Sequence, residues 1–351
     1  TANNLTPILA DNGVTLIGTS AQNIDRAENR SRFSEILDKL HIKQPLWQAF
    51  TSLNEAKNFA LQVEYPVIVR PSYVLSGAAM KVVWSQEELK EFVNNAAVVS
   101  PDHPVVISKF MLNSLEVDVD GVSNGDSVVI GAIVEHIDSA GVHSGDAMMC
   151  IPPWRLSNKI IENITDSTVR IAKEFQIKGP FNLQFLIHND QEYVIELNIR
   201  ASRSMPFVSK LVKNNLISIA SKAVLGKKLP EIPHNEWLKI KNHGIKVPQF
   251  SFMQLDGADI VLGVEMQSTG EAACFGDSFY DALSKGLISV GFTLPKSGTA
   301  LITIGGTENR EKLLPTLALL KKLGFTILAT EHTAEFLEEK IGDVDIVFKI
   351  S

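Results

Sequence analysis

Cysteine and long apolar runs are scarce in this sequence. Its 351 residues include two cysteines, Cys150 and Cys274, which are too few for a disulfide framework and favour a reducing compartment. No apolar stretch reaches the roughly 18 residues of a membrane span, so we expect no membrane partner. The net charge of −7 argues against a general affinity for nucleic acid. We therefore expect an ordinary globular protein of the cytoplasm, and a mitochondrial location stays open because a targeting segment would lie outside this sequence.

Two familiar nucleotide-binding motifs are also missing. The sequence contains neither G-x-x-x-x-G-K-[ST] nor G-x-G-x-x-G, so P-loop and dinucleotide-binding folds lose their main support. A Gly305-Gly306 pair precedes an expected helix and allows two interpretations. It is either an anion site at the helix N-terminus or a tight turn between strand and helix, and we favour the turn.

The hydrophobic pattern predicts mixed α and β structure in two or three domains. Expected helices are Asp25–Leu40, Leu53–Val63, Gln86–Ala96, Ile160–Phe175, Asn215–Leu225 and Arg310–Leu323. Expected strands are 15–19, 66–70 and 81–84, an antiparallel set at 105–107, 116–120, 128–130 and 132–135, a hairpin of 181–187 with 192–197, and a parallel βαβ unit at 301–304 and 325–328. Because the chain begins without Met and ends just after an apolar run, we expect it to be part of a longer protein.

The most informative stretch follows one of these strands. Glu196 and Asn198 are two residues apart, so their side chains share one side of the strand. Carboxylate and amide oxygens suit Mg²⁺, which usually also binds nucleotide phosphates. Arg200 and Arg203 follow and would neutralise phosphate oxygens. This pattern predicts an ATP site built without a P-loop.

Gln184 lies on the strand expected to pair with the one that carries Glu196. Side chains opposite each other on paired strands can reach the same ion, so we favour Gln184 as a metal ligand over a buried glutamine satisfied by backbone. Arg70 ends another strand, just before the small-residue loop 76–79. Such a loop with an arginine beside it either cradles phosphates or is a plain hairpin.

An acidic row and several histidines allow competing interpretations. Glu116, Asp118 and Asp120 alternate on one strand, where a solvated sheet face is the usual reading and a ribose-binding carboxylate the other, with no member distinguished. His136 and His143 do not match a common zinc spacing, so we favour a hydrogen bond from His143 beside a nucleotide. His103 and His188 are expected in loops.

Long motifs in this chain resemble the large chain of carbamoyl-phosphate synthetase, in particular the second of its two ATP-grasp halves. The resemblance runs almost end to end, and it rests on Val69-Arg-Pro-Ser-Tyr-Val-Leu-Ser-Gly-Ala-Ala-Met80, 103–110, Glu135–Asp146, Gly179–Gln184, Ile195-Glu-Leu-Asn-Ile-Arg-Ala-Ser-Arg203 and Phe207–Lys210. It implies an α+β ATP-grasp fold of two lobes, followed by part of an α/β parallel-sheet domain. The implied divisions are 1–24 (end of the preceding segment), 25–228 (ATP-grasp domain), 229–295 (its C-terminal extension) and 296–351 (the start of a methylglyoxal-synthase-like regulatory domain).

The resemblance also assigns roles by matching position. ATP would be held with two Mg²⁺ or Mn²⁺ ions, and with K⁺ as a further ion. The implied phosphate or anion contacts are Arg30 and Arg70, the adenosine pocket is Lys109, Met111 and Glu116, and the opposite wall is Gly141, Val142, His143 and Ser144. The implied metal ligands are Gln184, Glu196 and Asn198, while Arg200 and Arg203 would stabilise the transferred phosphoryl group.

The implied reaction is the phosphorylation of carbamate to carbamoyl phosphate. Carbamate would come from the first ATP-grasp half of the large chain, supplied with ammonia by a glutaminase subunit or domain. Synthesis of arginine, urea or pyrimidines stays open. His332 stands where the regulatory domain often has glycine, so no allosteric effector is assigned. Met148 and the run Leu211–Asn215 also depart from the family pattern. The competing hypotheses are another ATP-grasp ligase, such as a biotin-dependent carboxylase, and a non-catalytic nucleotide-binding module.

Overall fold

The computed structural model describes residues 2–71, 80–99, 105–252, 257, 260–264 and 266–348. The Ser76–Ala79 loop and His103 therefore lie outside the described residues. The chain divides into two compact units, Thr1–Val290 and Gly291–Ser351. Each unit has its own hydrophobic core, so each is described by itself.

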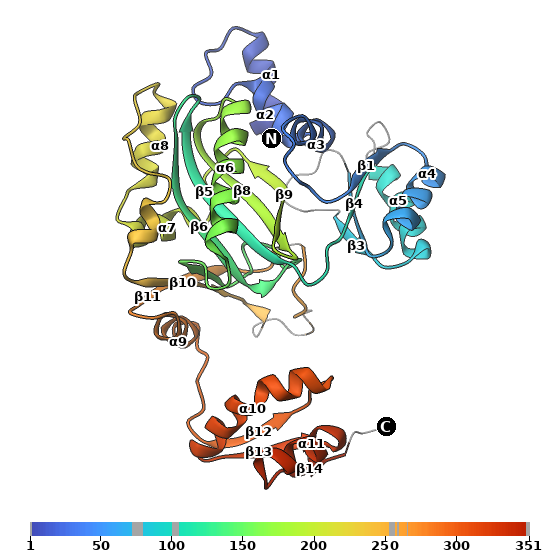
Figure 1. Cartoon of the computed structure of the whole chain (residues 1–351). Helices are drawn as coiled ribbons and strands as arrows, with labels where there is room; N and C mark the ends of the chain where they lie inside the picture. The colour runs from blue at the N-terminus through green and yellow to red at the C-terminus, as the bar shows by residue number, and fades with distance from the viewer. Residues whose placement is uncertain are drawn as a thin grey trace. The chain divides into compact units, whose positions relative to one another are not determined.

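A seven-stranded antiparallel sheet forms the centre of the first unit (Figure 1). In the order in which they pair, its strands are β11 (Gly270–Gly276), β10 (His243–Gln249), β7 (Met149–Ile151), β6 (Val128–Ser139), β5 (Leu115–Asn124), β8 (Lys178–His188) and β9 (Gln191–Asn198). The predicted hairpin of β8 and β9 is confirmed. The two strands expected at 128–130 and 132–135 are one continuous strand, β6.

Helices α6 (Asn158–Glu174), α7 (Ser204–Val212) and α8 (Leu216–Val224) pack against this sheet. Both alternating sets of β5 side chains are buried: the apolar set with Val117 and Val119, and the acidic set with Glu116, Asp118 and Asp120. Because successive side chains of a strand point to opposite faces, both faces of β5 are covered. The expectation of a solvated acidic face is therefore wrong: these carboxylates lie inside the protein.

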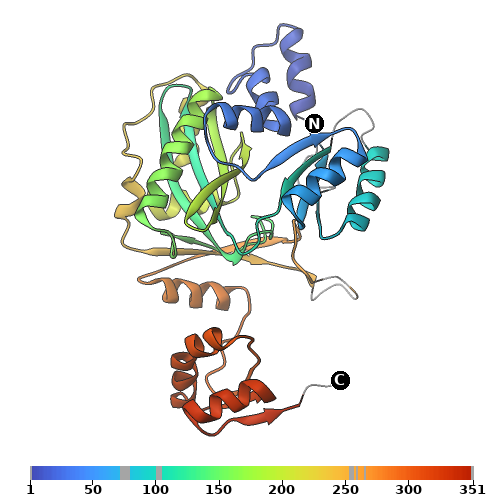
Figure 2. The same ribbon diagram turned by 45° about the vertical axis from the view of Figure 1, so that its right-hand side comes forward.

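A smaller lobe contains a four-stranded sheet in the order β1 (Trp47–Phe50), β4 (Val105–Lys109), β2 (Val67–Pro71) and β3 (Lys81–Val83). Helices α4 (Leu53–Val63) and α5 (Gln86–Val99) pack together beside it (Figure 2). The strand expected at 105–107 belongs here as β4 and does not pair with β5 or β6, so its predicted place is wrong. This strand is apolar on both of its faces, so its sequence pattern does not indicate which of the two sheets it joins.

The N-terminal segment departs from prediction twice. Residues 15–19 form no strand, and the region is helical around them, with α1 (Ala2–Asp11) before and α2 (Ala21–Glu28) after. The single helix expected from Asp25 to Leu40 is broken at Asn29, where α2 ends and α3 (Arg30–Lys39) begins. Asn29 has an extended backbone, and its side chain accepts a hydrogen bond from the N–H of Arg32, so it caps α3.

The remaining elements of the first unit are the 3₁₀ turn η1 (Glu236–Lys239) and α9 (Phe279–Ser289). In the second unit, β12 (Gly298–Ile302), β13 (Phe325–Thr330) and β14 (Asp345–Val347) are parallel, with α10 (Thr307–Lys322) and α11 (Glu331–Ile341) as crossovers. The predicted βαβ unit is confirmed. Among the described helices, none is both long and apolar enough to cross a membrane.

Candidate functional site

A cavity of about 510 Å³ lies within the first unit, lined by residues from both lobes and from α2 and α3. The central sheet contributes side chains from β5, β8 and β9, and the smaller lobe contributes Ile68, Arg70 and Lys109. Of the site residues predicted from the sequence, those that line it are Arg30, Arg70, Lys109, Met111, Glu116, Gly141, Val142, His143, Ser144, Gln184, Glu196, Asn198 and Arg200. Arg203 is not among its lining residues.

The oxygen donors predicted to bind metal meet in this cavity. Gln184 on β8 is the direct cross-strand partner of Glu196 on β9, and Asn182 is the partner of Asn198 in the same ladder. Gln184, Glu196 and Asn198 all line the cavity. Their side chains offer two amide oxygens and one carboxylate, which is a donor set that a hard divalent cation accepts. The register of one hairpin therefore brings together residues that are twelve positions apart in the sequence.

Glu196 is held in its ionised form. Its Oε2 accepts a 2.6 Å hydrogen bond from Nη2 of Arg30, whose Nη1 donates to the backbone oxygen of Ile195 at 3.0 Å. Burial alone would raise the pKa of Glu196, but the charge and hydrogen bond of Arg30, together with the charge of Arg70, outweigh burial and lower this pKa to about 2. A carboxylate must be ionised to bind a cation, so Arg30 keeps Glu196 ready for one.

Arg70 brings a second guanidinium into the same cavity. Its Nε is buried and has no hydrogen-bond partner among the described residues. Burial and the nearby charge of Arg30 both lower the pKa of Arg70, while Glu196 and Glu116 oppose that shift. A buried guanidinium N–H without a partner is costly, and an anion bound in the cavity would satisfy it. Among the described residues, this unpaired donor is the feature that would favour an anion in the cavity.

The structure distinguishes Glu116 from its acidic neighbours. Glu116 lines the cavity, whereas Asp118 and Asp120 do not. Burial raises the pKa of Glu116 to about 7, against the opposing effects of His136 and of a hydrogen bond from the backbone of Gly141. That hydrogen bond joins β5 to the loop that carries the opposite wall of the cavity.

The two histidines weighed for zinc lie in different surroundings. His136 is buried, with its Nε2 3.4 Å from Oδ1 of Asp118, and the carboxylates of Asp118 and Glu116 raise its pKa although burial opposes them. The ligand atoms of Glu116, Asp118 and His136 lie within 4.8 Å of one another. His143 instead lines the cavity, and its Nδ1 accepts a 3.0 Å hydrogen bond from the N–H of Gly145. Burial lowers the pKa of His143, which favours its neutral, hydrogen-bonding form.

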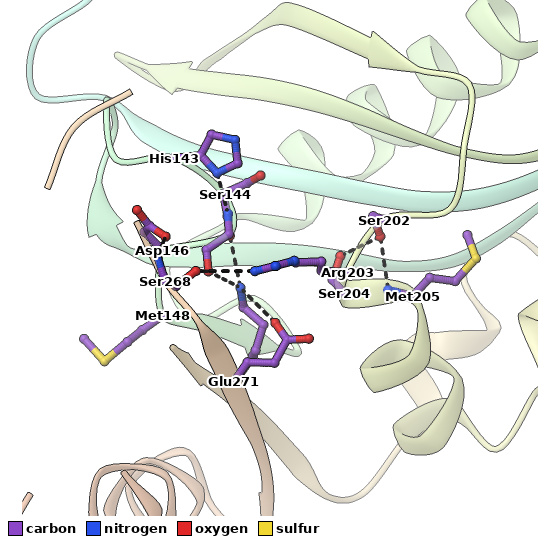
Figure 3. Close-up of polar contacts among 12 residues, drawn as sticks. His143, Ser144, Asp146, Met148, Ser202, Arg203, Ser204, Met205, Ser268 and Glu271 are labelled. Atoms are coloured by element: carbon purple, nitrogen blue, oxygen red, sulfur yellow. Dashed lines mark hydrogen bonds and ion pairs between the residues drawn. The ribbon is translucent and has the colours of Figure 1, made fainter. Parts of the chain in front are cut away.

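The turn at 143–146 is supported by residues that the sequence analysis did not single out. The ammonium of Lys246, in the middle of β10, donates to the backbone oxygens of Ser144 at 3.0 Å and Gly145 at 3.4 Å. The carboxylate of Asp146 accepts the backbone N–H groups of Gln267 and Ser268, each at 2.8 Å. Figure 3 shows this turn, with Glu271 beside it. The sequence did contain a signal, because Lys246 interrupts an apolar run. In the structure its side chain is only 1% exposed.

The two predicted catalytic arginines differ in their contacts. Arg200 lines the cavity, and its Nη2 donates to Oδ1 of Asn198 at 3.3 Å. Nη1 of Arg203 donates to Oγ of Ser268 at 3.4 Å, and Ser268 in turn donates to the backbone oxygen of Gly145 at 3.2 Å (Figure 3). Arg203 therefore contacts the support of the 143–146 turn, while Arg200 contacts a candidate metal ligand.

Solved structures show which fold this cavity belongs to. The chain is similar to the biotin carboxylase of Campylobacter jejuni, with a TM-score of 0.68, 16% identity, and coverage of 83% of this chain and 72% of that one. It is also similar to an N5-carboxyaminoimidazole synthase from Aspergillus clavatus, with a TM-score of 0.64, 17% identity, and coverage of 82% and 79%. The fold is therefore the α+β ATP-grasp fold, as the family resemblance implied.

Sequence comparison gives the family within this fold. A family profile described as "Carbamoyl-phosphate synthase L chain, ATP binding domain" matches residues 29–232, and the chain belongs to that family. It is 46% identical over 97% of its length to the carbamoyl phosphate synthase large chain of Sulfurisphaera tokodaii. It is 48% identical over 95% of its length to the mitochondrial carbamoyl-phosphate synthase [ammonia] of Aquarana catesbeiana, and 46% identical over 99% to the multifunctional protein pyr-3 of Neurospora crassa.

The chain spans only part of these relatives: 32%, 22% and 19% of their respective lengths. The likeness to biotin carboxylase is one of fold at low identity, whereas the likeness to the synthases is one of sequence along almost the whole chain. The hypothesis of a biotin-dependent carboxylase thus loses its support.

Proposed function

We propose that this chain phosphorylates carbamate to carbamoyl phosphate with ATP and Mg²⁺, as the second synthetase half of a carbamoyl-phosphate synthase large chain. The observation that carries the proposal is a single cavity in which Glu196, Gln184 and Asn198 face the guanidinium groups of Arg30 and Arg70. The relatives named above, at 46% and 48% identity, are carbamoyl phosphate synthases.

The phosphoryl transfer requires the protein mainly to position the reactants and to supply positive charge. A carbamate oxygen attacks the γ-phosphorus of ATP, the bond from that phosphorus to the β–γ bridging oxygen breaks, and ADP leaves with the electron pair. Carbamate is already anionic, so no strong base is needed, and phosphoryl transfer depends mainly on alignment and on neutralising oxygen charge. Arg70, Arg200 and Arg203 would supply positive charge, and Arg30 would keep Glu196 ionised.

The donor set fits a divalent cation. Gln184, Glu196 and Asn198 would hold Mg²⁺ or Mn²⁺, and the bound ion would neutralise phosphate charge and fix the triphosphate. Two ions for each site and a further K⁺ are part of the proposal. Lys109, Met111 and Glu116 would surround the adenosine, with Glu116 on the ribose, and the wall from Gly141 to Ser144 would close the other side.

The domain divisions and partners are proposed with the function. The ATP-grasp domain would occupy residues 25–228, after the end of a preceding segment at 1–24, and residues 229–295 would extend it. A methylglyoxal-synthase-like regulatory domain would begin at Lys296, which is supported by the compact parallel unit Gly291–Ser351. The rest of the large chain and a glutaminase would be the partners, in pyrimidine or in arginine and urea synthesis, with the cytoplasm as the proposed location.

The reverse reaction tests the proposal in the simplest way. With Mg²⁺ present, the chain should make ATP from ADP and carbamoyl phosphate, because this direction needs neither ammonia nor the first synthetase half. ATP formation would be followed with luciferase, with a sample lacking carbamoyl phosphate as the control. A chain that binds Mg-ATP yet forms no ATP in this assay would be a non-catalytic nucleotide-binding module.

Lys246→Met provides a test of the nucleotide wall. We expect ATP to bind about tenfold more weakly, equal to about 1.4 kcal/mol, because the carbonyls of Ser144 and Gly145 lose the hydrogen bonds from the Lys246 ammonium. Calorimetric titration with Mg-ATP measures the effect. Lys241→Met, at an exposed lysine just before β10, is the matched control. Equal affinities of the two variants would remove Lys246 from the support of the site.

A further inference from the structure

A buried carboxylate lies beneath the segment that carries the two arginines. Asp120 on β5 is 0% exposed and does not line the cavity. It accepts three hydrogen bonds from side chains: from Oγ of Ser202 at 2.5 Å, from Oγ of Ser204 at 2.6 Å and from Nδ2 of Asn182 at 3.1 Å. These bonds occupy both carboxylate oxygens, so the buried charge is solvated by protein donors instead of water.

The three donors fix the path of the chain where it leaves β9. Asn182 is the cross-strand partner of Asn198, the last residue of β9. Ser202 and Ser204 lie on either side of Arg203, between β9 and the first turn of α7. Oγ of Ser202 also accepts the N–H of Met205 at 3.1 Å and lies 2.9 Å from Oγ of Ser204 (Figure 3). One carboxylate thus sets the position of the residues around Arg203.

A buried carboxylate at this position lowers the stability of the fold. No basic side chain forms an ion pair with Asp120 among the described residues, and the negative charge of Asp118 raises the pKa of Asp120 further. Burial raises the pKa of Asp120 to about 6, against the stabilising hydrogen bonds from Ser202, Ser204 and Asn182. An apolar residue would pack at lower cost in a core of this kind. The presence of this carboxylate is better explained by the segment that it positions than by a contribution to the stability of the fold.

We propose that Asp120 is a positioning residue, which aligns the 199–204 segment so that Arg200 and Arg203 present their charge to the transferred phosphoryl group. The proposal rests on the proposed function of the cavity. Asp120 acts through Ser202 and Ser204, and it is not among the described residues that line the cavity. Loss of alignment at a phosphoryl-transfer site lowers the rate more than the affinity.

Asp120→Asn keeps the shape of the side chain but replaces one acceptor oxygen with an NH₂ group. Because serine hydroxyls both donate and accept, the fold can persist while the geometry of the segment changes. We expect kcat of the reverse reaction to fall by about 10²-fold, with the KM for ADP unchanged. Asp126→Asn, at an exposed residue in the turn after β5, is the matched control.

A double variant distinguishes positioning from general damage. If Asp120 acts through the arginine segment, Asp120→Asn should slow Arg203→Met by a smaller factor than it slows the unmodified chain, because one of the two arginines that it aligns is already gone. Additive losses in the double variant, or an unchanged kcat in Asp120→Asn, would overturn the proposal.

Hydrogen exchange gives a readout that does not depend on activity. The amide of Met205 should exchange faster in Asp120→Asn than in the unmodified chain, because its acceptor Ser202 is no longer held, while amides of β6 should exchange as before. Unchanged exchange at Met205 would overturn the positioning role even if the chain catalysed no reaction. Faster exchange in a chain without reverse activity would keep the positioning role and remove the proposed function.

Discussion

Glu196→Gln is expected to abolish the magnesium-dependent part of ATP binding and to lower turnover by about 10²- to 10³-fold, the loss typical of removing one preorganised charged group. Glu196 is the only carboxylate among the three candidate metal ligands, and the charge of Arg30 keeps it ionised with a pKa of about 2. The amide of glutamine keeps the size of the side chain but has no charge to offer a cation.

The measurement is calorimetric titration with ATP, with and without Mg²⁺, on both forms of the chain. Glu192→Gln, on the same strand but outside the cavity, controls for the loss of a negative charge from β9. Equal magnesium dependence in Glu196→Gln and the unmodified chain would contradict the metal site.

The pH dependence of stability offers a second check on the same residue. Because the pKa of Glu196 falls from 4.5 to about 2 in the folded chain, ionised Glu196 stabilises the fold above its unfolded pKa, and this contribution disappears as pH falls through the folded value. The unmodified chain should therefore be more stable than Glu196→Gln at neutral pH. The difference in unfolding free energy should shrink as pH falls from about 4 towards 2.

Arg70→Met should separate activity from stability. We expect turnover to fall by about 10²- to 10³-fold, because a charge that neutralises phosphate oxygens is lost. Stability should stay the same or rise, since the buried Nε of Arg70 has no described partner and the guanidinium is repelled by Arg30. Thermal unfolding and the reverse assay measure the two effects on the same preparations.

The controls for Arg70 differ in charge and in location. Arg70→Lys should recover only part of the rate, because a compact ammonium cannot make the forked contacts of a guanidinium. Arg170→Met removes an arginine of the α6 surface and should leave turnover unchanged. A large loss of stability in Arg70→Met would show that Arg70 is a structural residue, and the anion site would lose its main support.

The sequence predicted the parts of the site that depend on local periodicity. The alternation along β9 and its pairing with β8 bring Gln184 opposite Glu196, and this register follows from a short hairpin. Arg70 was expected at a strand end and lies at the end of β2. Their chemical roles remain predictions, but their meeting in one cavity follows from simple strand geometry.

Features that depend on long-range packing could not be predicted from the sequence pattern. Whether the acidic row on β5 faces water depends on which helices cover the sheet, and nothing in the alternation of Glu116, Asp118 and Asp120 reveals that cover. The pairing of β4 with β2 and the contact of Lys246 with Ser144 both join segments distant in sequence. The break at Asn29 was missed because its sequence neighbourhood does not show that Asn29 leaves the helical conformation and caps the next helix.

The hydrogen bonds from Gln267 and Ser268 to Asp146 cross more than a hundred residues of chain. The family profile ends at residue 232, well before these donors. A truncated version cut at that boundary would keep Gln184 and Glu196 but would leave the 143–146 turn without Lys246, on β10, and Ser268, just before β11. Because β11 also pairs with the strand that carries Lys246, we expect the smallest portion that holds a nucleotide firmly to extend to Gly276.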